Sequence, residues 1–210
     1  MRQLTDSEIN ILTGRGCSAT NWNDITVSDD FDPCRLRNVE FSGSVSIGPL
    51  NGTFSLAGGV TRRSEIRNAM LHNVSVGRDV YISGIANFIA NYDIADGVYI
   101  ENVDSIVATL DSTFGIGTEV SVLNETGGRE VAIYERLSAH TAYLMAMYRN
   151  RSLMVAKIVG LIKSHSEQLR GRRGQIGAGT HIANSGEILN IMIGDGTRID
   201  GAARLNNGYI

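Results

Sequence analysis

The residues best suited to acid–base chemistry in this chain are its four histidines. They are His72, His140, His165 and His181. A histidine with an ordinary pKa of about 6.5 takes up and releases protons near neutral pH. A reaction that removes a proton from a hydroxyl or an amine would therefore use one of these side chains as its base.

His140 and His72 are the two candidates for that catalytic base. His140 follows Leu137 by three residues, at the edge of an apolar helical pattern, where a helix is expected to meet the rest of the fold. The alternative for His140 is a boundary histidine that is hydrogen-bonded to a neighbour. His72 is expected to face outward, either into a cleft between subunits, where it would act as the base, or into solvent.

The densest polar segment of the chain runs from Asn124 to Glu130. Asn124, Glu125 and Arg129 are the predicted substrate-binding residues. Glu125 would orient a histidine, and Arg129 would bind a phosphate or carboxylate through two parallel hydrogen bonds. The alternative is a glycine turn followed by the N-terminus of a helix, where the helix dipole would stabilise Glu130.

A six-residue apolar repeat in residues 76–111 must supply the framework that positions these side chains. The apolar residues that open each six are Val76, Ile82, Phe88, Ile94, Ile100 and Ile106. Because side chains on a strand alternate between its faces, the first and fifth places can both point into one interior. Gly77, Gly84 and Gly97 suit tight corners. A short fixed period of this kind predicts a stacked β-solenoid.

The repeat resembles the left-handed parallel β-helix of hexapeptide-repeat proteins. The segments that match its motif are Ile176–His181 and Ile193–Arg198. Residues 120–131 and 137–140 resemble a narrower group of long bacterial hexapeptide-repeat proteins, classed as a domain of unknown function. The resemblance implies a trimer and acyl transfer from acyl-CoA or acyl-carrier protein. The γ-type carbonic anhydrases share that fold and bind zinc through histidines, but here no two histidines are close in sequence, so no metal is expected.

The apolar spacing becomes helical near Val131, and glycine is nearly absent between Arg129 and Gly171. We therefore expect an inserted helical hairpin at residues 131–172, broken near residue 150, with Ser152 capping the second helix. The other expected regions are an N-terminal cap at residues 1–35, β-helix coils at 36–130 and continuing coils at 173–210.

The two ends of the chain are expected to differ. Residues Thr5 to Glu8 form a capping-box pattern, so a short helix should begin after Thr5 and end at Gly14. The final residues still carry the six-residue repeat, and an open coil edge favours aggregation. We therefore expect a fragment of a longer protein, or a partner chain that covers this edge.

Composition excludes several classes of function. The net charge of −3 gives no basic surface for nucleic acid, and no apolar run is long enough to span a membrane. The first residues lack the apolar core of a signal peptide. Cys17 and Cys34 lack the spacing of metal or redox sites. These features indicate a reduced, cytoplasmic protein.

The expected fold class is mainly β: a left-handed parallel β-helix with a short N-terminal helical cap and an inserted α-helical hairpin. The expected function is acyl transfer to a sugar or nucleotide-sugar, with no bound cofactor and with acyl-CoA as co-substrate. His140 or His72 would act as the base. The alternative is a non-enzymatic β-solenoid that binds or assembles partners, or a regulatory domain of a larger enzyme.

Overall fold

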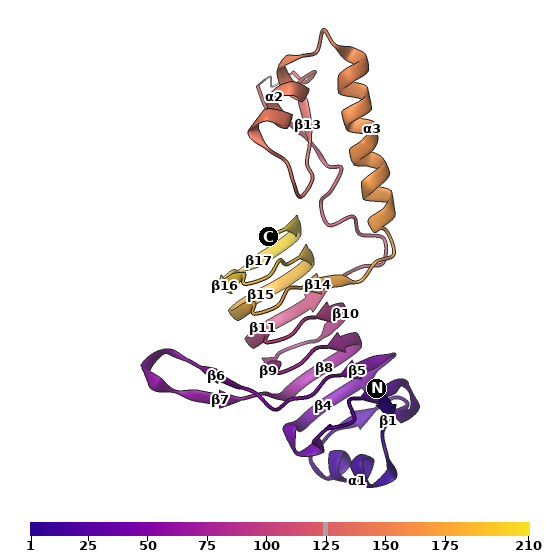
Figure 1. Cartoon of the computed structure of the whole chain (residues 1–210), viewed down its shortest axis with the longest axis vertical. Coiled ribbons are helices and arrows are strands. Elements are labelled where there is room, and N and C mark those ends of the chain that lie inside the picture. Colours follow the sequence, from indigo (N-terminus) through magenta and orange to yellow (C-terminus); the bar gives the residue numbers. More distant parts are fainter. Residues whose placement is uncertain (124–125) are drawn as a thin grey trace. The chain divides into compact units, whose positions relative to one another are not determined.

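The computed structural model describes residues 1–123 and 126–210, which form two compact units (Figure 1). Unit 1 comprises residues 1–109, 173–206 and 210. Unit 2 comprises residues 110–172 and 207–209. Unit 1 is therefore assembled from segments that lie on both sides of unit 2 in the sequence.

Unit 1 is built mainly from strands. Its helical elements are α1 (Asp6–Gly14) and the short 3-10 turns η1 (Trp22–Asp24), η2 (Pro33–Arg35) and η3 (Ala57–Gly59). Its first strands are β1 (Arg2–Gln3), β2 (Ser18–Ala19), β3 (Ile25–Val27), β4 (Leu36–Ser42), β5 (Val45–Ile47), β6 (Thr53–Ser55), β7 (Thr61–Arg63), β8 (Glu65–Val76), β9 (Tyr81–Ile85), β10 (Ile89–Ile94) and β11 (Tyr99–Val107). After unit 2 follow β14 (Gly174–Ile176), β15 (His181–Met192) and β16 (Arg198–Asp200), and the chain ends with β17 (Arg204–Tyr209).

Four parallel strands form a closed ring in unit 1. Strand β8 pairs with β9 and with β10, and β11 pairs with the same two strands. Strands β9 and β10 pair with consecutive segments of β8, residues 65–67 and 71–76, and with consecutive segments of β11, residues 99–103 and 106–107, so the four strands close into a ring. The fully buried aliphatic residues of these strands, each 0% exposed, include Ile66, Leu71, Ile82, Ile89, Ile100 and Ile106.

The six-residue apolar repeat correctly predicts which side chains are buried, with one exception. Val76, Ile82, Ile94, Ile100 and Ile106 are at most 3% exposed, whereas Phe88 is 39% exposed. The buried residues align in register, because Ile82 lies opposite Ile66 on β8 and opposite Ile100 on β11. Full burial of each such side chain contributes about 2 kcal/mol of hydrophobic free energy.

The predicted fold class, a left-handed parallel β-helix of hexapeptide repeats, is corrected by the strand pairing. Among the described residues, the closed ring is part of a branched 13-stranded sheet, which also contains the antiparallel pair β1–β3. The antiparallel pairs β6–β7 and β12–β13 form two separate sheets. Strands β8 and β15 each run for 12 residues and pair with several partners. The six-residue spacing specifies a buried face, but it does not specify which strands pair.

Bends inside the long strands are made by asparagines with left-handed backbone. The asparagines with positive φ are Asn38, Asn68, Asn73, Asn91, Asn102, Asn184, Asn190 and Asn207. Asparagine tolerates this conformation because its short amide can hydrogen-bond locally. The amides also bond one another across strands: Asn73 Nδ2 donates to Asn91 Oδ1 at 3.2 Å, and Asn91 Nδ2 donates to the Ala108 carbonyl at 2.8 Å. The bends at Asn73 and Asn91 are therefore tied to each other across β8 and β10.

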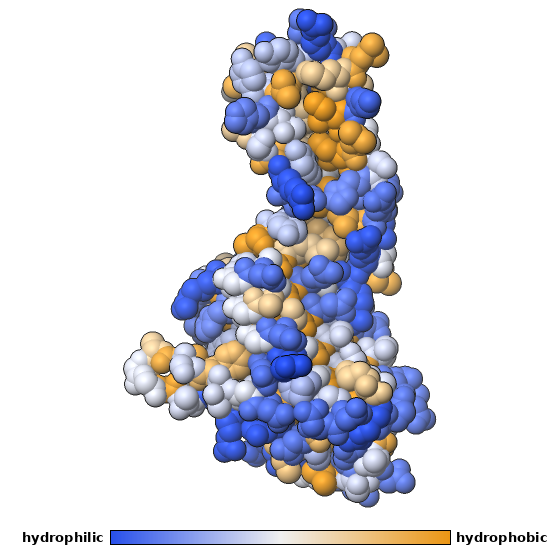
Figure 2. All heavy atoms as spheres, viewed as in Figure 1, coloured by the Kyte–Doolittle hydropathy of each residue, from blue (hydrophilic) through white to orange (hydrophobic). Residues whose placement is uncertain are grey.

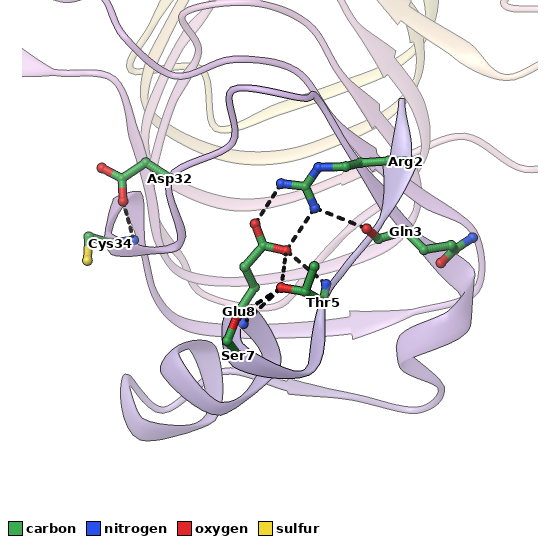
Figure 3. Close-up of polar contacts among 7 residues, drawn as sticks. All are labelled: Arg2, Gln3, Thr5, Ser7, Glu8, Asp32 and Cys34. Atoms are coloured by element: carbon green, nitrogen blue, oxygen red, sulfur yellow. Dashed lines mark hydrogen bonds and ion pairs between the residues drawn. The ribbon is translucent and has the colours of Figure 1, made fainter.

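The N-terminal helix α1 is capped as its sequence predicts (Figure 3). The Glu8 backbone N–H donates to Thr5 Oγ1 at 3.4 Å, and the Thr5 backbone N–H donates to Glu8 Oε2 at 2.8 Å. Arg2 donates to both oxygens of the same carboxylate, at 2.8 and 2.7 Å. The hydrogen bond from Arg2, followed by those from Thr5, lowers the pKa of Glu8 from 4.5 to about 2.

Unit 2 contains an antiparallel hairpin and two helices. The hairpin pairs β12 (Glu119–Ser121) with β13 (Glu130–Ala132), and the helices are α2 (Ala139–Met147) and α3 (Ser152–Leu169). The predicted break between the helices is confirmed, but Ser152 is the first residue of α3 and Arg151 takes the cap position without a side-chain hydrogen bond. Within the described ranges, no helix is both long enough and apolar enough to cross a bilayer.

Removing the Asn91 side chain should destabilise unit 1. Asn91→Ala places alanine at φ 59°, a left-handed conformation that alanine adopts poorly. It also removes the hydrogen bond to the Ala108 carbonyl. Together these two effects should lower the free energy of unfolding by about 2 to 4 kcal/mol. Asn91→Gly should lose less, because glycine adopts this backbone freely. The measurement is urea unfolding followed by circular dichroism. Asn10→Ala, on the exposed face of α1, is the control and should shift stability by less than about 0.5 kcal/mol. Equal stability of Asn91→Ala and the wild type would contradict this account of the bends.

The Arg2–Glu8 pair should make stability depend on acidic pH. Because the folded pKa of Glu8 is about 2 and its ordinary value is 4.5, its contribution is fully present above pH 4.5 and is lost as pH falls through 2. Glu8→Gln should therefore lower the melting temperature at pH 7. The difference from the wild type should shrink between pH 4.5 and 2, as measured by thermal melts. A difference that stays constant across this range would refute the assignment.

Candidate functional site

His72 lies beside a serine in unit 1. The pairing of β4 with β8 places Ser42 directly opposite His72, and Ser42 Oγ lies 2.7 Å from His72 Nδ1. The other ring nitrogen, Nε2, lies 3.0 Å from Asn73 Nδ2. A serine next to a histidine is the arrangement of an activated nucleophile and its base, so the position of the ring proton decides what the pair can do.

The hydrogen bonds around Asn73 determine that proton position. Asn73 Oδ1 accepts from the Ser44 backbone N–H at 3.0 Å, so the Asn73 NH₂ group faces His72. An amide nitrogen only donates, and His72 Nε2 must therefore accept. In the neutral ring the proton then lies on Nδ1 and is donated to Ser42 Oγ. His72 cannot take a proton from Ser42 in this arrangement, and both of its nitrogens are occupied.

The remaining predicted site residues belong to the sequence of unit 2. His140 is exposed in the first turn of α2, and its side chain has no hydrogen bond to any residue in the described part of the chain. Arg129 Nη1 lies 3.3 Å from Met147 Sδ. The predicted binding residues Asn124 and Glu125 lie outside the described residues. His72 belongs to unit 1, so the predicted site residues are divided between the two units.

A cavity in unit 2 brings together a histidine and two hydroxyl groups that the sequence did not associate. Its volume is about 450 Å³, and α2 and α3 contribute most of its lining. The apolar part of the lining is Leu144, Ile158, Leu161 and Ile162. The polar part is His165 with Tyr134 and Thr141, whose hydroxyl oxygens are 3.4 Å apart.

His165 is oriented by a carboxylate. Its Nε2 lies 2.9 Å from Glu135 Oε1. An ionised carboxylate only accepts hydrogen bonds, so Nε2 carries a proton, and in the neutral ring Nδ1 has the free lone pair. The other oxygen, Glu135 Oε2, is buried with no hydrogen-bond partner among residues 1–123 and 126–210. A base held by a carboxylate at the wall of an apolar cavity is the geometry of a general base.

The sequence alone predicts the helix that carries His165, but it does not predict the contact of His165 with Glu135. The helical spacing of apolar residues predicts α3, on which His165 lies. Glu135 lies 30 residues earlier, before α2 begins, and no local pattern links residues at that separation. The contact depends on how the turn before α2 packs against α3.

His181 has a structural role in unit 1. Its ring stacks on that of Tyr99 with a centroid distance of 4.6 Å and an interplanar angle of 1°. Tyr99 in turn stacks on Tyr81 at 4.7 Å. Burial, followed by the charge of Arg198, lowers the pKa of His181. Among the described residues, no group of three or more His, Cys, Asp or Glu side chains is arranged to hold a metal ion.

Comparisons with known proteins show relatives without an assigned activity. The family model described as "Domain of unknown function (DUF4954)" matches residues 1–210. An uncharacterized protein of Treponema pallidum (strain Nichols) is 28% identical over 217 residues, which cover 98% of this chain and 30% of that protein. The chain thus spans less than a third of the length of that curated relative. No solved structure matches the chain.

The ring tautomer of His72 can be tested by exchanging its amide neighbour. In ¹⁵N-resolved NMR spectra at neutral pH, the wild type should show the proton on Nδ1. Asn73→Asp presents a carboxylate that only accepts, so the proton should move to Nε2. Ser42→Ala leaves the amide in place and should keep the proton on Nδ1. A wild-type ring with its proton on Nε2 would overturn this assignment.

Proposed function

Because the chain belongs to the family described as Domain of unknown function (DUF4954) over residues 1–210, we propose its function from the chemistry of unit 2. The chain is an acyltransferase-like enzyme. It moves an acyl group from acyl-CoA or acyl-carrier protein to a hydroxyl of a sugar or nucleotide-sugar. The observation that carries the proposal is the Glu135–His165 pair at the wall of an apolar cavity.

The pair supplies the base that acyl transfer requires. His165 Nδ1 accepts the proton of the acceptor hydroxyl while that oxygen attacks the thioester carbonyl carbon. The C–O bond forms, the C–S bond breaks, and the thiolate leaves with the proton that His165 returns. Glu135 stabilises the positive charge that His165 carries between these two steps. No net proton or electron is gained or lost by the protein.

The cavity supports the same chemistry in two further ways. Its apolar side chains provide a surface against which an acyl chain can pack. The Tyr134 and Thr141 hydroxyls line the same space, where one of them can donate to the carbonyl oxygen as negative charge develops on it. This assignment places the base at His165, whereas catalysis by His72 or His140 stays a prediction from the sequence.

A non-enzymatic binding or assembly module is the second candidate function. It is favoured by the exposed apolar residues of α3, where Leu153 is 88% and Leu161 is 65% exposed. Isolated apolar residues on a surface are ordinary, so this observation carries less weight than the Glu135–His165 pair. A module of this kind would bind ligands or partners without forming an acylated product.

A reducing, cytoplasmic location is part of the proposal. Both cysteines are free thiols, Cys17 buried and Cys34 exposed. Free thiols persist in reducing compartments, whereas secreted proteins tend to pair them.

Replacing His165 should abolish most of the activity. The chain is incubated with acyl-CoAs of graded length and a panel of nucleotide-sugars, and acylated product is measured by mass spectrometry. His165→Ala should lower kcat about 100-fold or more. Glu135→Gln should lower kcat by less, because the imidazolium loses its anionic partner.

The control for this assay is Gln168→Ala, an exposed substitution on the same helix, which should leave kcat unchanged. Circular dichroism establishes that each variant is folded. If the wild type forms no acylated product with any pair of substrates, the enzymatic proposal fails. If His165→Ala is as active as the wild type, the assignment of the base fails.

A further inference from the structure

A second cavity of unit 2 is lined entirely by apolar side chains. Its volume is about 480 Å³, which lies in the range of about 300 to 1,000 Å³ that is typical of small-molecule sites. Strand β12 contributes Val120, strand β13 contributes Val131, and helix α2 contributes Ala142, Ala146 and Met147. The two antiparallel strands and α2 therefore form an apolar cavity, whose surface offers no polar group for acid–base or nucleophilic catalysis.

The walls of this cavity include both buried and open positions. Val131 and Ala146 are each 3% exposed, whereas Leu123 is 69% and Tyr143 is 55% exposed. Figure 2 shows hydrophobic residues gathered on the surface of unit 2. A ligand that covers these side chains would gain about 25 cal/mol for each Å² of apolar surface removed from water.

A cationic group lies next to the cavity. The Arg129 guanidinium nitrogen Nη1 is 3.3 Å from Met147 Sδ, and Met147 is one of the lining residues. A thioether is a weak acceptor, so this contact uses little of the binding capacity of the guanidinium. The adjacent carboxylate of Glu130 is directed to Arg149, at 3.1 Å. Arg129 is thus placed to bind an anionic head group at the edge of an apolar space.

We propose that this cavity binds the hydrocarbon chain of a fatty carboxylate, with Arg129 holding the carboxylate. The apolar lining selects the chain, and the guanidinium selects an anionic head over a neutral or cationic one. This inference goes beyond the proposed function, because a free fatty carboxylate carries no thioester. The binding itself is measured without turnover.

The test titrates the full chain with dodecanoate by isothermal calorimetry. Wild-type protein should bind dodecanoate, and it should bind dodecanol and dodecyltrimethylammonium more weakly. Arg129→Gln should weaken dodecanoate binding at least about tenfold, since a charged hydrogen bond is lost, while leaving dodecanol binding unchanged. Ala142→Phe, which fills a half-buried lining position, should weaken binding of both dodecanoate and dodecanol.

The matched control is Arg151→Gln, an exposed arginine outside both cavities, which should bind dodecanoate as the wild type does. Thermal melts verify that each variant is folded, and Arg129→Gln keeps the test decisive if Ala142→Phe does not fold. Absence of dodecanoate binding, equal binding of the cationic amphiphile, or wild-type affinity in Arg129→Gln would each overturn the proposal.

Failure here is distinguishable from failure of the proposed function. If acylated product depends on His165 but dodecanoate does not bind, the enzyme stands and this site is wrong. If dodecanoate binds through Arg129 and no acylated product forms, the site stands and the enzymatic activity is wrong.

Discussion

The left-handed backbone at the asparagine bends is the constraint on which unit 1 depends. A strand of 12 residues such as β8 can serve several partners only if it changes direction within its length. Asn68 and Asn73 provide that change, with φ near 50°. Because asparagine amides bond across strands, as Asn102 Nδ2 does to Asn184 Oδ1 at 3.0 Å, the bends are aligned from strand to strand. Within the ring of parallel strands, Asn73 of β8 and Asn91 of β10 are joined in this way.

The sequence predicts the core of unit 1 better than it predicts its topology. The six-residue spacing identifies Ile82, Ile94 and Ile100 as buried, because a residue's face depends only on its place along the strand. Pairing depends on how much chain lies between strands, and here the hairpin β6–β7 separates Phe41 from its partner Leu71. No periodic pattern encodes such insertions, and for this reason the hexapeptide interpretation misassigned the architecture.

The candidate site differs from the sequence prediction for a related reason. The helical spacing located α2 and α3, but helical spacing does not specify which side chains meet between helices. Glu135 lies in the turn before α2, and it meets His165 of α3 through tertiary packing that no local pattern specifies. His72 was expected to face a cleft or solvent, yet the register of β4 against β8 gives it Ser42, and the bend at Asn73 gives it an amide. Both contacts arise from strand pairing, which the sequence did not reveal.

Three of the four histidines differ in which of their ring atoms are already in contact with the fold. In unit 1, the His72 ring has both nitrogens hydrogen-bonded, and the His181 ring is stacked on Tyr99. In unit 2, His165 uses one nitrogen to bind Glu135 and presents the other beside an apolar cavity. A group can exchange protons with a ligand only where the fold leaves it a lone pair. On this argument, the base of the proposed reaction lies in unit 2 rather than in unit 1.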